Sequence, residues 1–155
     1  MNMDSEGSAI SVIGAYPQIV RGKKIVISVG KRKTAIARAV IRPGIGRHRV
    51  NGVPIEIWPI EMARLKMMEP YMLLSPELRN SVDIDVHVEG GGVMSQAYAV
   101  RIAVARGLIV FFGIQSLLEL FKEYDRTMIA GDPRRTEPEK WMRYSARRFR
   151  QKSYR

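Results

Sequence analysis

Apolar and polar positions alternate along two segments of the chain. In residues 81–89 valines and an isoleucine alternate with Asp83, Asp85, His87 and Glu89. In residues 35–42 three alanines and an isoleucine alternate with larger or charged side chains. A period of two residues is typical of a strand that buries one face, so both segments are predicted strands. The small alanine face would let a helix approach closely.

Shorter patterns predict further strands and tight turns. Residues 24–29, KIVISV, are rich in β-branched residues and precede Gly30, which we expect to end the strand. Residues 43–46 predict a turn, and Asn51-Gly52, after a short strand at 47–50, is a typical hairpin dipeptide. Because the connections are tight, the strands are predicted to form an antiparallel meander.

Helical spacing is found in three segments. A helical region is expected from Pro54 to Glu69-Pro70, with a stripe made of Ile57, Met62, Leu65 and Met68. Three methionines in or just after it, Met67, Met68 and Met72, are interpreted as core filling. Residues 96–110 are apolar nearly all round, which predicts a buried helix. After Gly113 an amphipathic helix is predicted from Ile114, Leu117, Leu118 and Phe121.

The periodicity also suggests how the chain is divided. Residues 1–22 are small, polar and mixed, and we expect an N-terminal extension there. Residues 23–130 are predicted to form one globular domain. Gly131-Asp132-Pro133 marks its edge, and residues 131–155 are expected to be an extended basic C-terminal tail.

Charge changes the picture, because the formal net charge of +11 is unevenly distributed. Residues 21–49 hold ten Lys or Arg and no acid, and residues 141–155 hold six Lys or Arg and no acid. A protein that is merely basic and soluble usually intersperses its charges. Two segregated cationic blocks instead favour a surface that binds a polyanion, since each cation placed near a phosphate releases counterions.

Several classes of protein are disfavoured by composition. Cysteine is absent, which excludes disulfides, thiolate catalysis and Cys-based zinc sites. The first ten residues lack the basic and apolar regions of a secretory signal. The most apolar window, residues 97–114, contains Arg101 and Arg106, which are costly at a bilayer centre. A cytoplasmic protein is the simplest expectation.

Candidate catalytic and metal-binding patterns are weak. Residues 90–92, a glycine triplet before a helix, could be a phosphate cradle or simply a tight turn, and no P-loop or G-x-G-x-x-G pattern is present. Neighbours on one strand face, such as Asp83 and Asp85, stand about 7 Å apart, too far to grip one ion comfortably. His48, between Arg47 and Arg49, suits a phosphate or ribose contact better than general-base work. We predict no catalytic residue, metal or cofactor.

The C-terminal segment mixes aromatic residues with arginine. Trp141, Tyr144, Phe149 and Tyr154 are interleaved with the six basic residues, and no apolar face forms at helical spacing. Arginine grips phosphate and stacks, and aromatic rings stack on exposed bases. This mixture favours structured RNA over a lipid surface, with the tail ordering on its partner.

Taken together, the motifs resemble the family of small-subunit ribosomal protein number nine, in its archaeal form. The blocks that carry the resemblance are residues 29–39 (VGKRKTAIARA), 50–52 (VNG), 85–92 (DVHVEGGG), 96–106 (QAYAVRIAVAR), 125–126, 131–135 (GDPRR) and 151–155 (QKSYR). It covers about residues 24 to 155, and the ordered set is far more specific than any single block.

The resemblance implies an α+β domain with a four-stranded, mainly antiparallel sheet backed by helices. It implies a structural constituent of the small ribosomal subunit, which binds the ribosomal RNA of the head beside neighbouring ribosomal proteins, without a membrane or a small-molecule substrate. It also implies that the tail threads through RNA and that its last arginine reaches the anticodon stem-loop of the transfer RNA in the P site.

Individual roles follow by position. The residues expected to hold ribosomal RNA are Lys31, Arg32, Lys33, Arg38, Arg42, Arg47, Arg49, Arg143, Arg147, Arg148 and Arg150. By the resemblance, Lys152 and Arg155 would touch transfer RNA. Two alternatives remain at this point: an RNA-processing or phosphotransfer enzyme subunit on a related fold, which the glycine triplet would serve, and a basic DNA-binding module, which lacks a recognition helix with polar tips.

Overall fold

The computed structural model describes residues 12, 14–20, 22–151, 153 and 154. Six strands form one sheet in the order β1-β2-β3-β6-β4-β5. The strands are β1 (Ala15–Val20), β2 (Lys23–Arg32), β3 (Ala35–Pro43), β4 (His48–Val50), β5 (Val53–Pro54) and β6 (Val82–Glu89). The helices are η1 (Ile55–Ile57), α1 (Glu61–Met72), α2 (Pro76–Asn80), α3 (Val93–Phe112), α4 (Gln115–Tyr124) and α5 (Thr127–Ala130).

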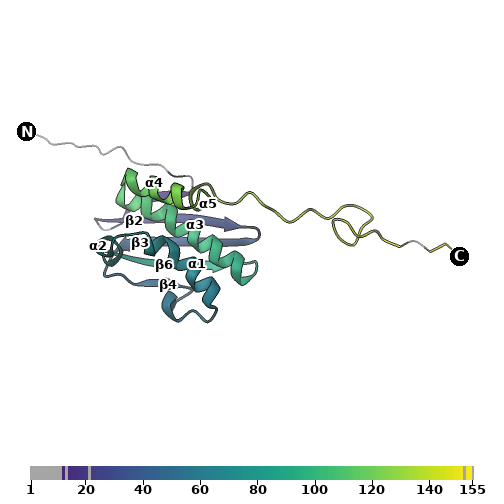
Figure 1. The fold of residues 1–155 in the computed structure, drawn as a ribbon, viewed down its shortest axis with the longest axis horizontal. Helices are drawn as coiled ribbons and strands as arrows, with labels where there is room; N and C mark the ends of the chain where they lie inside the picture. Colours follow the sequence, from purple (N-terminus) through teal and green to yellow (C-terminus); the bar gives the residue numbers. More distant parts are fainter. Residues whose placement is uncertain (1–11, 13, 21, 152, 155) are drawn as a thin grey trace, which may run out of the picture.

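Strands and helices form two layers, and the chain after α5 leads away from them (Figure 1). The long helix α3 lies across β2 and β3, with α1 beside it. The α+β class is therefore confirmed, but the sheet has six strands instead of the four expected. One added strand is β1, in which residues 15–20 of the expected N-terminal extension pair antiparallel with β2.

The alternating segments form strands as predicted. On β3 the alanine face is fully buried beneath α3, and on β6 the valines and Ile84 are buried on the same side. The strand predicted at residues 24–29 is β2. It continues through Gly30 to Arg32, so the predicted end of this strand at Gly30 is wrong. A Cβ at Gly30 would lie 2.1 Å from the carbonyl oxygen of Ala99 on α3, so this glycine permits close helix packing and does not end the strand.

The predicted meander is also wrong. The hairpin at Asn51-Gly52 forms between β4 and β5, but β6 lies between β3 and β4 and pairs parallel with β4. The loop that connects β3 to β4 therefore crosses the N-terminal end of β6. Asp83 of β6 accepts hydrogen bonds from the backbone N–H of Ile45 and of Arg47, each at 2.9 Å, which holds this loop in place. Sequence spacing could not show this long-range contact.

Helix α1 departs from the predicted stripe. Its buried face is Ala63, Met67, Pro70 and Tyr71, whereas Met62 is 68% exposed. Met67 fills the core as expected, but Met72 is exposed. Pro70 lies inside the last turn and lacks the N–H that would bond to the carbonyl group one turn earlier, yet the helix runs on to Met72.

The two remaining helices match their patterns more closely. Helix α3 is longer than expected, from Val93 to Phe112, and residues 99–110 are all buried except Arg106. It is long and apolar enough to cross a membrane, but 67% of its apolar window is buried inside the protein, as in a core helix. Helix α4 buries Leu117 and Phe121, as its amphipathic stripe predicts.

Candidate nucleic-acid interface

Basic side chains mark the face of the sheet opposite the helices, which we call the open sheet face. Because side chains alternate along a strand, burial of the alanine face of β3 places Arg38 and Arg42 on the open sheet face. Arg49 lies there too, since its neighbours on β4, His48 and Val50, are buried. All three arginines are exposed, and so is Arg47 in the loop before β4. The sheet thus brings together four of the predicted RNA contacts.

Acidic residues of β6 lie on the same face and organise these arginines. The guanidinium of Arg42 lies 2.5 Å from a carboxylate oxygen of Asp85. The backbone N–H of Arg47, helped by that of Ile45, lowers the pKa of the Asp83 carboxyl. Within the described part of the chain no three His, Cys, Asp or Glu side chains come together as a possible metal site. Arg42 is thus paired within the sheet, whereas Arg38 and Arg49 have no ion pair to any described residue.

The hairpin between β2 and β3 divides its three predicted contacts. Arg32 turns to the helix side, where it pairs with Asp132 and lies 5.4 Å from the ring of Tyr98. Lys31 and Lys33 are exposed, and Lys33 sits in the turn with a φ of 54°. The structure therefore places Arg32 in an internal ion pair and leaves the two lysines accessible to a partner.

His48 does not face solvent, so its expected phosphate contact is wrong. Its ring is buried and lies 4.2 Å from the ring of Tyr71, at a tilt of 35°. Burial is the main cause that lowers the pKa of this histidine, with a smaller contribution from the charge of Arg79. The flanking arginines suggested an exposed anion site, because the sequence of so short a strand does not show which of its two faces is buried.

The glycine triplet forms a tight turn. Gly90 and Gly91 have φ values of 75° and 65°, which favour glycine. A Cβ at Gly90 would come within 2.6 Å of the carbonyl oxygen of Thr34, so the turn packs against the β2–β3 hairpin. The sequence left two interpretations of this triplet open, a phosphate cradle and a tight turn. The close backbone packing supports the tight turn.

Sequence reasoning missed the role of Arg101, which it used only as an argument against a membrane. This α3 side chain is 1% exposed, and its nitrogens lie 2.6 Å from Glu69 and 2.7 Å from Asp125. The first contact is an ion pair without aligned hydrogen-bond geometry. Burial tends to raise the pKa of Asp125, but hydrogen bonds from Thr127 and from Arg101 outweigh it and lower that pKa. Two arginines, Arg101 and Arg106, within an otherwise apolar helix are the only signal the sequence offers.

The tail forms a small loop of its own, visible beyond the domain in Figure 1. Arg143 and Phe149 pair as an isolated bridge, and the Arg143 guanidinium lies 4.2 Å from the Phe149 ring centre. Arg150 lies 5.2 Å from the ring of Tyr144. Arg147 is 86% exposed and pairs with Glu137 at 2.9 Å. Lys152 and Arg155, the predicted transfer-RNA contacts, lie outside the described residues.

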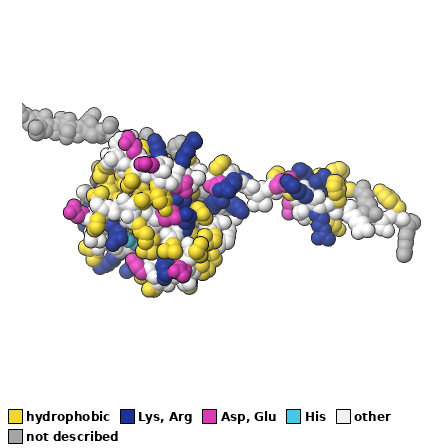
Figure 2. Space-filling view, viewed as in Figure 1, with side chains coloured by type: hydrophobic (Ala, Val, Ile, Leu, Met, Phe, Trp, Pro, Cys, Tyr) yellow, Lys and Arg dark blue, Asp and Glu magenta, His cyan; other side chains and the backbone are white. Residues whose placement is uncertain are grey.

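Lys and Arg side chains gather along the tail loop and where the chain leaves the domain (Figure 2). Arg143, Arg147, Arg148 and Arg150 come together there within a few residues, and Arg148 and Arg150 are exposed. Arginine–aromatic stacking in this loop shows how the same side chains could stack on bases and grip phosphates. The predicted basic residues therefore fall into two groups, one on the open sheet face and hairpin and one on the tail.

Comparison with known proteins gives a consistent result. Residues 30–155 match the family model described as Ribosomal protein S9/S16. The small ribosomal subunit protein uS9 of Aeropyrum pernix is 61% identical, over 86% of this chain and 98% of the relative. The proteins of the same name from Desulfurococcus amylolyticus and Pyrobaculum aerophilum are each 62% identical, over 85% of this chain and 94% and 92% of those relatives.

Proposed function

The chain belongs to the ribosomal protein S9/S16 family, and we propose that its folded domain and its tail hold ribosomal RNA in two different ways. Like its relatives, which are small ribosomal subunit proteins, it has a structural role in the ribosome of the cytoplasm and is not an enzyme. The phosphotransfer alternative is therefore set aside, and the tight packing of the glycine triplet agrees with this.

The domain contributes a rigid basic surface. Arg38 and Arg49 project from strands of the open sheet face, and Lys31 and Lys33 from the adjoining hairpin. Strands fix the spacing of these cations, so they suit RNA phosphates held at fixed positions. Because Arg32 is paired internally with Asp132, we assign it to the fold and leave it out of the contact surface.

The tail contributes an adaptable surface, and this carries the proposal. Residues 141–155 hold six Lys or Arg and no acid, and the described side chains of Trp141, Phe149 and Tyr154 are exposed. Exposed large aromatic rings beside basic side chains are typical of a surface that a partner covers. We propose that this segment enters RNA and that Lys152 and Arg155 at its end touch the transfer RNA in the P site, as the family resemblance implies.

Deleting residues 141–155 tests this division. The logarithm of the affinity for a small-subunit head RNA falls with the logarithm of salt by about 0.7 to 0.9 for each phosphate neutralised. The deletion is therefore expected to flatten this slope by several units. A variant with only Lys152→Gln and Arg155→Gln keeps most of the slope but loses cross-linking to P-site transfer RNA in reconstituted subunits. An unchanged slope after the deletion contradicts the tail as an RNA-binding arm.

A further inference from the structure

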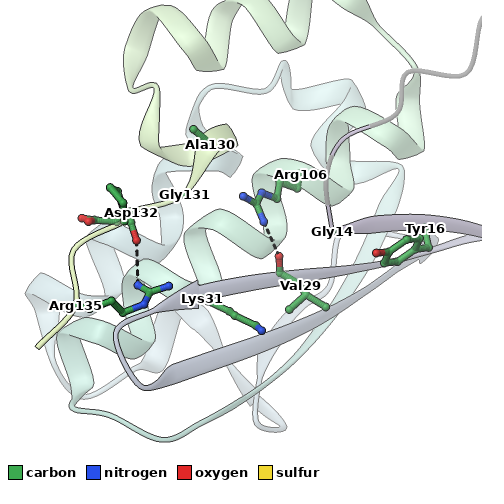
Figure 3. A pocket seen from close by; sticks show the side chains of 10 residues that line it. Gly14, Tyr16, Val29, Lys31, Arg106, Ala130, Gly131, Asp132 and Arg135 are labelled. Carbon is green, nitrogen blue, oxygen red and sulfur yellow. Dashed lines mark hydrogen bonds between the residues drawn. The ribbon is translucent and has the colours of Figure 1, made fainter. Parts of the chain in front are cut away.

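A pocket of about 660 Å³ lies where the tail leaves the domain. Segments far apart in the sequence meet there: β1 and β2, helix α3, and the chain after α5 (Figure 3). The lining residues are Gly14, Tyr16, Val29, Lys31, Arg106, Ala130, Gly131, Asp132, Pro133 and Arg135. Three of these residues are cationic and one is acidic, so the pocket carries a net positive charge.

Arg106 forms the inner wall of the pocket. Its Nε donates a hydrogen bond to the carbonyl oxygen of Ile129 at 2.8 Å, and its Nη1 donates to that of Val29 at 3.1 Å. Among the described residues it has no carboxylate partner, unlike Arg101 five residues earlier on the same helix. Burial lowers the pKa of Arg106, which means that its charge is partly desolvated without a compensating acid.

Two glycines let the backbone pass close to this guanidinium. Gly14 and Gly131 have φ values of 87° and 83°, which favour glycine. A Cβ at Gly14 would lie 3.2 Å from Nη1 of Arg106, and one at Gly131 would lie 3.2 Å from Nη2. The Nη2 group therefore sits beside Gly131 at the pocket wall and makes no hydrogen bond within the described part of the chain.

The outer rim adds two cations, whereas the single acid is already neutralised. Lys31 and Arg135 are exposed, and Arg135 donates to the carbonyl oxygen of Asp132 at 3.1 Å. The Asp132 carboxylate is paired with Arg32 and lies 2.9 Å from Arg134. Two further cations thus neutralise the acid, and among the described residues Lys31, Arg106 and Arg135 have no carboxylate partner.

We propose that this pocket binds a phosphate group of an RNA backbone and so fixes the root of the tail. The proposal rests on the RNA-binding function proposed above and adds a defined site to it. Guanidinium groups form strong charge-assisted hydrogen bonds to phosphate, and Nη2 of Arg106, which has no hydrogen-bond partner among the described residues, can donate one. The volume of the pocket exceeds that of a single phosphate ion. Tyr16, which lies at the rim and is 62% exposed, can cover the ribose next to the bound phosphate.

A pair of double variants tests the pocket. Lys31→Gln with Arg135→Gln removes both rim cations, whereas Lys23→Gln with Arg79→Gln removes two exposed cations that do not line the pocket. Both doubles lose the same charge and leave Arg106 and the core intact. At about 0.1 M salt we expect the pocket double to bind a small-subunit head RNA about tenfold more weakly than the control double.

A second measurement locates the anion. Titration of the full-length protein with inorganic phosphate is expected to shift the NMR signals of the Gly131 amide and the Arg106 Nε–H, and the pocket double is expected to abolish these shifts. Equal RNA affinity of the two doubles, or phosphate shifts that persist in the pocket double, overturns the pocket. Failure of the wild-type chain to prefer this RNA over an unrelated folded RNA instead overturns the proposed function.

Discussion

The folded domain and the tail use arginine in opposite ways. In the domain Arg101 is 1% exposed and its two charged partners come from α1 and from the residue after α4. In the tail Arg147 is 86% exposed, and its carboxylate partner Glu137 is itself well exposed. A buried charge stabilises a fold only when its partners are in place, whereas an exposed ion pair contributes little.

This difference separates arginines that stabilise the fold from arginines that are available to bind a partner. Arg101 and Arg32 are both turned inward onto acids and lie near the ring of Tyr98, at 5.9 Å and 5.4 Å. Arg143 and Arg150 in the tail lie against aromatic rings of the tail itself. Arg106 combines both situations, because it is half-buried and its hydrogen bonds to described residues go to backbone carbonyl groups alone. Whether an arginine stabilises the fold or is available to a partner is therefore indicated by its burial and its acidic partners, since all of these arginines carry the same charge.

Replacing Arg101 should produce the largest effect. Arg101→Met leaves Glu69 and Asp125 without their shared cation, which is expected to lower the free energy of unfolding by about 3 to 5 kcal/mol. Urea unfolding followed by circular dichroism measures this change. Arg147→Met, at the exposed tail position, is the control and should shift it by less than about 0.5 kcal/mol. Should Arg101→Met not fold, Glu69→Gln supplies a milder disruption; equal stabilities of Glu69→Gln and wild type would contradict the structural role.

A smaller effect is expected from the buried histidine of the domain. The folded-state pKa of His48 is lowered by burial, so the unfolded chain binds more protons in the window just below pH 6.5. Stability is then fully present above pH 6.5 and is lost as the pH falls through the lowered pKa, by at most about 1.4 kcal/mol per pH unit. Urea unfolding between pH 7.5 and pH 5 checks this. His48→Phe should remove the histidine part of this dependence, and His87→Gln, on the exposed side of β6, should retain it.

The sequence predicted those parts of the fold that local periodicity controls. The alternation of β3 and β6 and the stripe of α4 gave the correct element and the correct buried face, because burial of one face imposes that period. Long-range contacts decided the rest. The position of β6 between β3 and β4 depends on side-chain and backbone contacts of Asp83 that no local pattern contains. Gly30 resembled a strand terminator for the same reason, since its close contact with α3 lies far away in sequence.

The candidate site was predicted unevenly for a similar physical reason. Segregated charge drew attention to the basic hairpin and the tail, but it could not distinguish Arg32, which pairs with Asp132, from its exposed neighbours Lys31 and Lys33. Nor could it identify Arg106, whose isolation from acids is visible only when β2, α3 and the chain after α5 are seen together. Charge patterning predicts the amount of cationic surface, and packing decides which cations remain available.

The smallest effect on folding is expected in the tail loop, and it tests the comparison from the other side. Phe149 is 73% exposed, and its ring lies against Arg143 of the same loop. Phe149→Leu should therefore change the free energy of unfolding by less than about 0.5 kcal/mol. The same variant should bind head RNA more weakly, because loss of one stacking ring costs about 1 to 3 kcal/mol. If the free energy of unfolding fell by more than about 1 kcal/mol while the RNA affinity stayed the same, the tail loop would be part of the fold. The distinction between buried structural arginines and exposed RNA-binding arginines would then fail at this position.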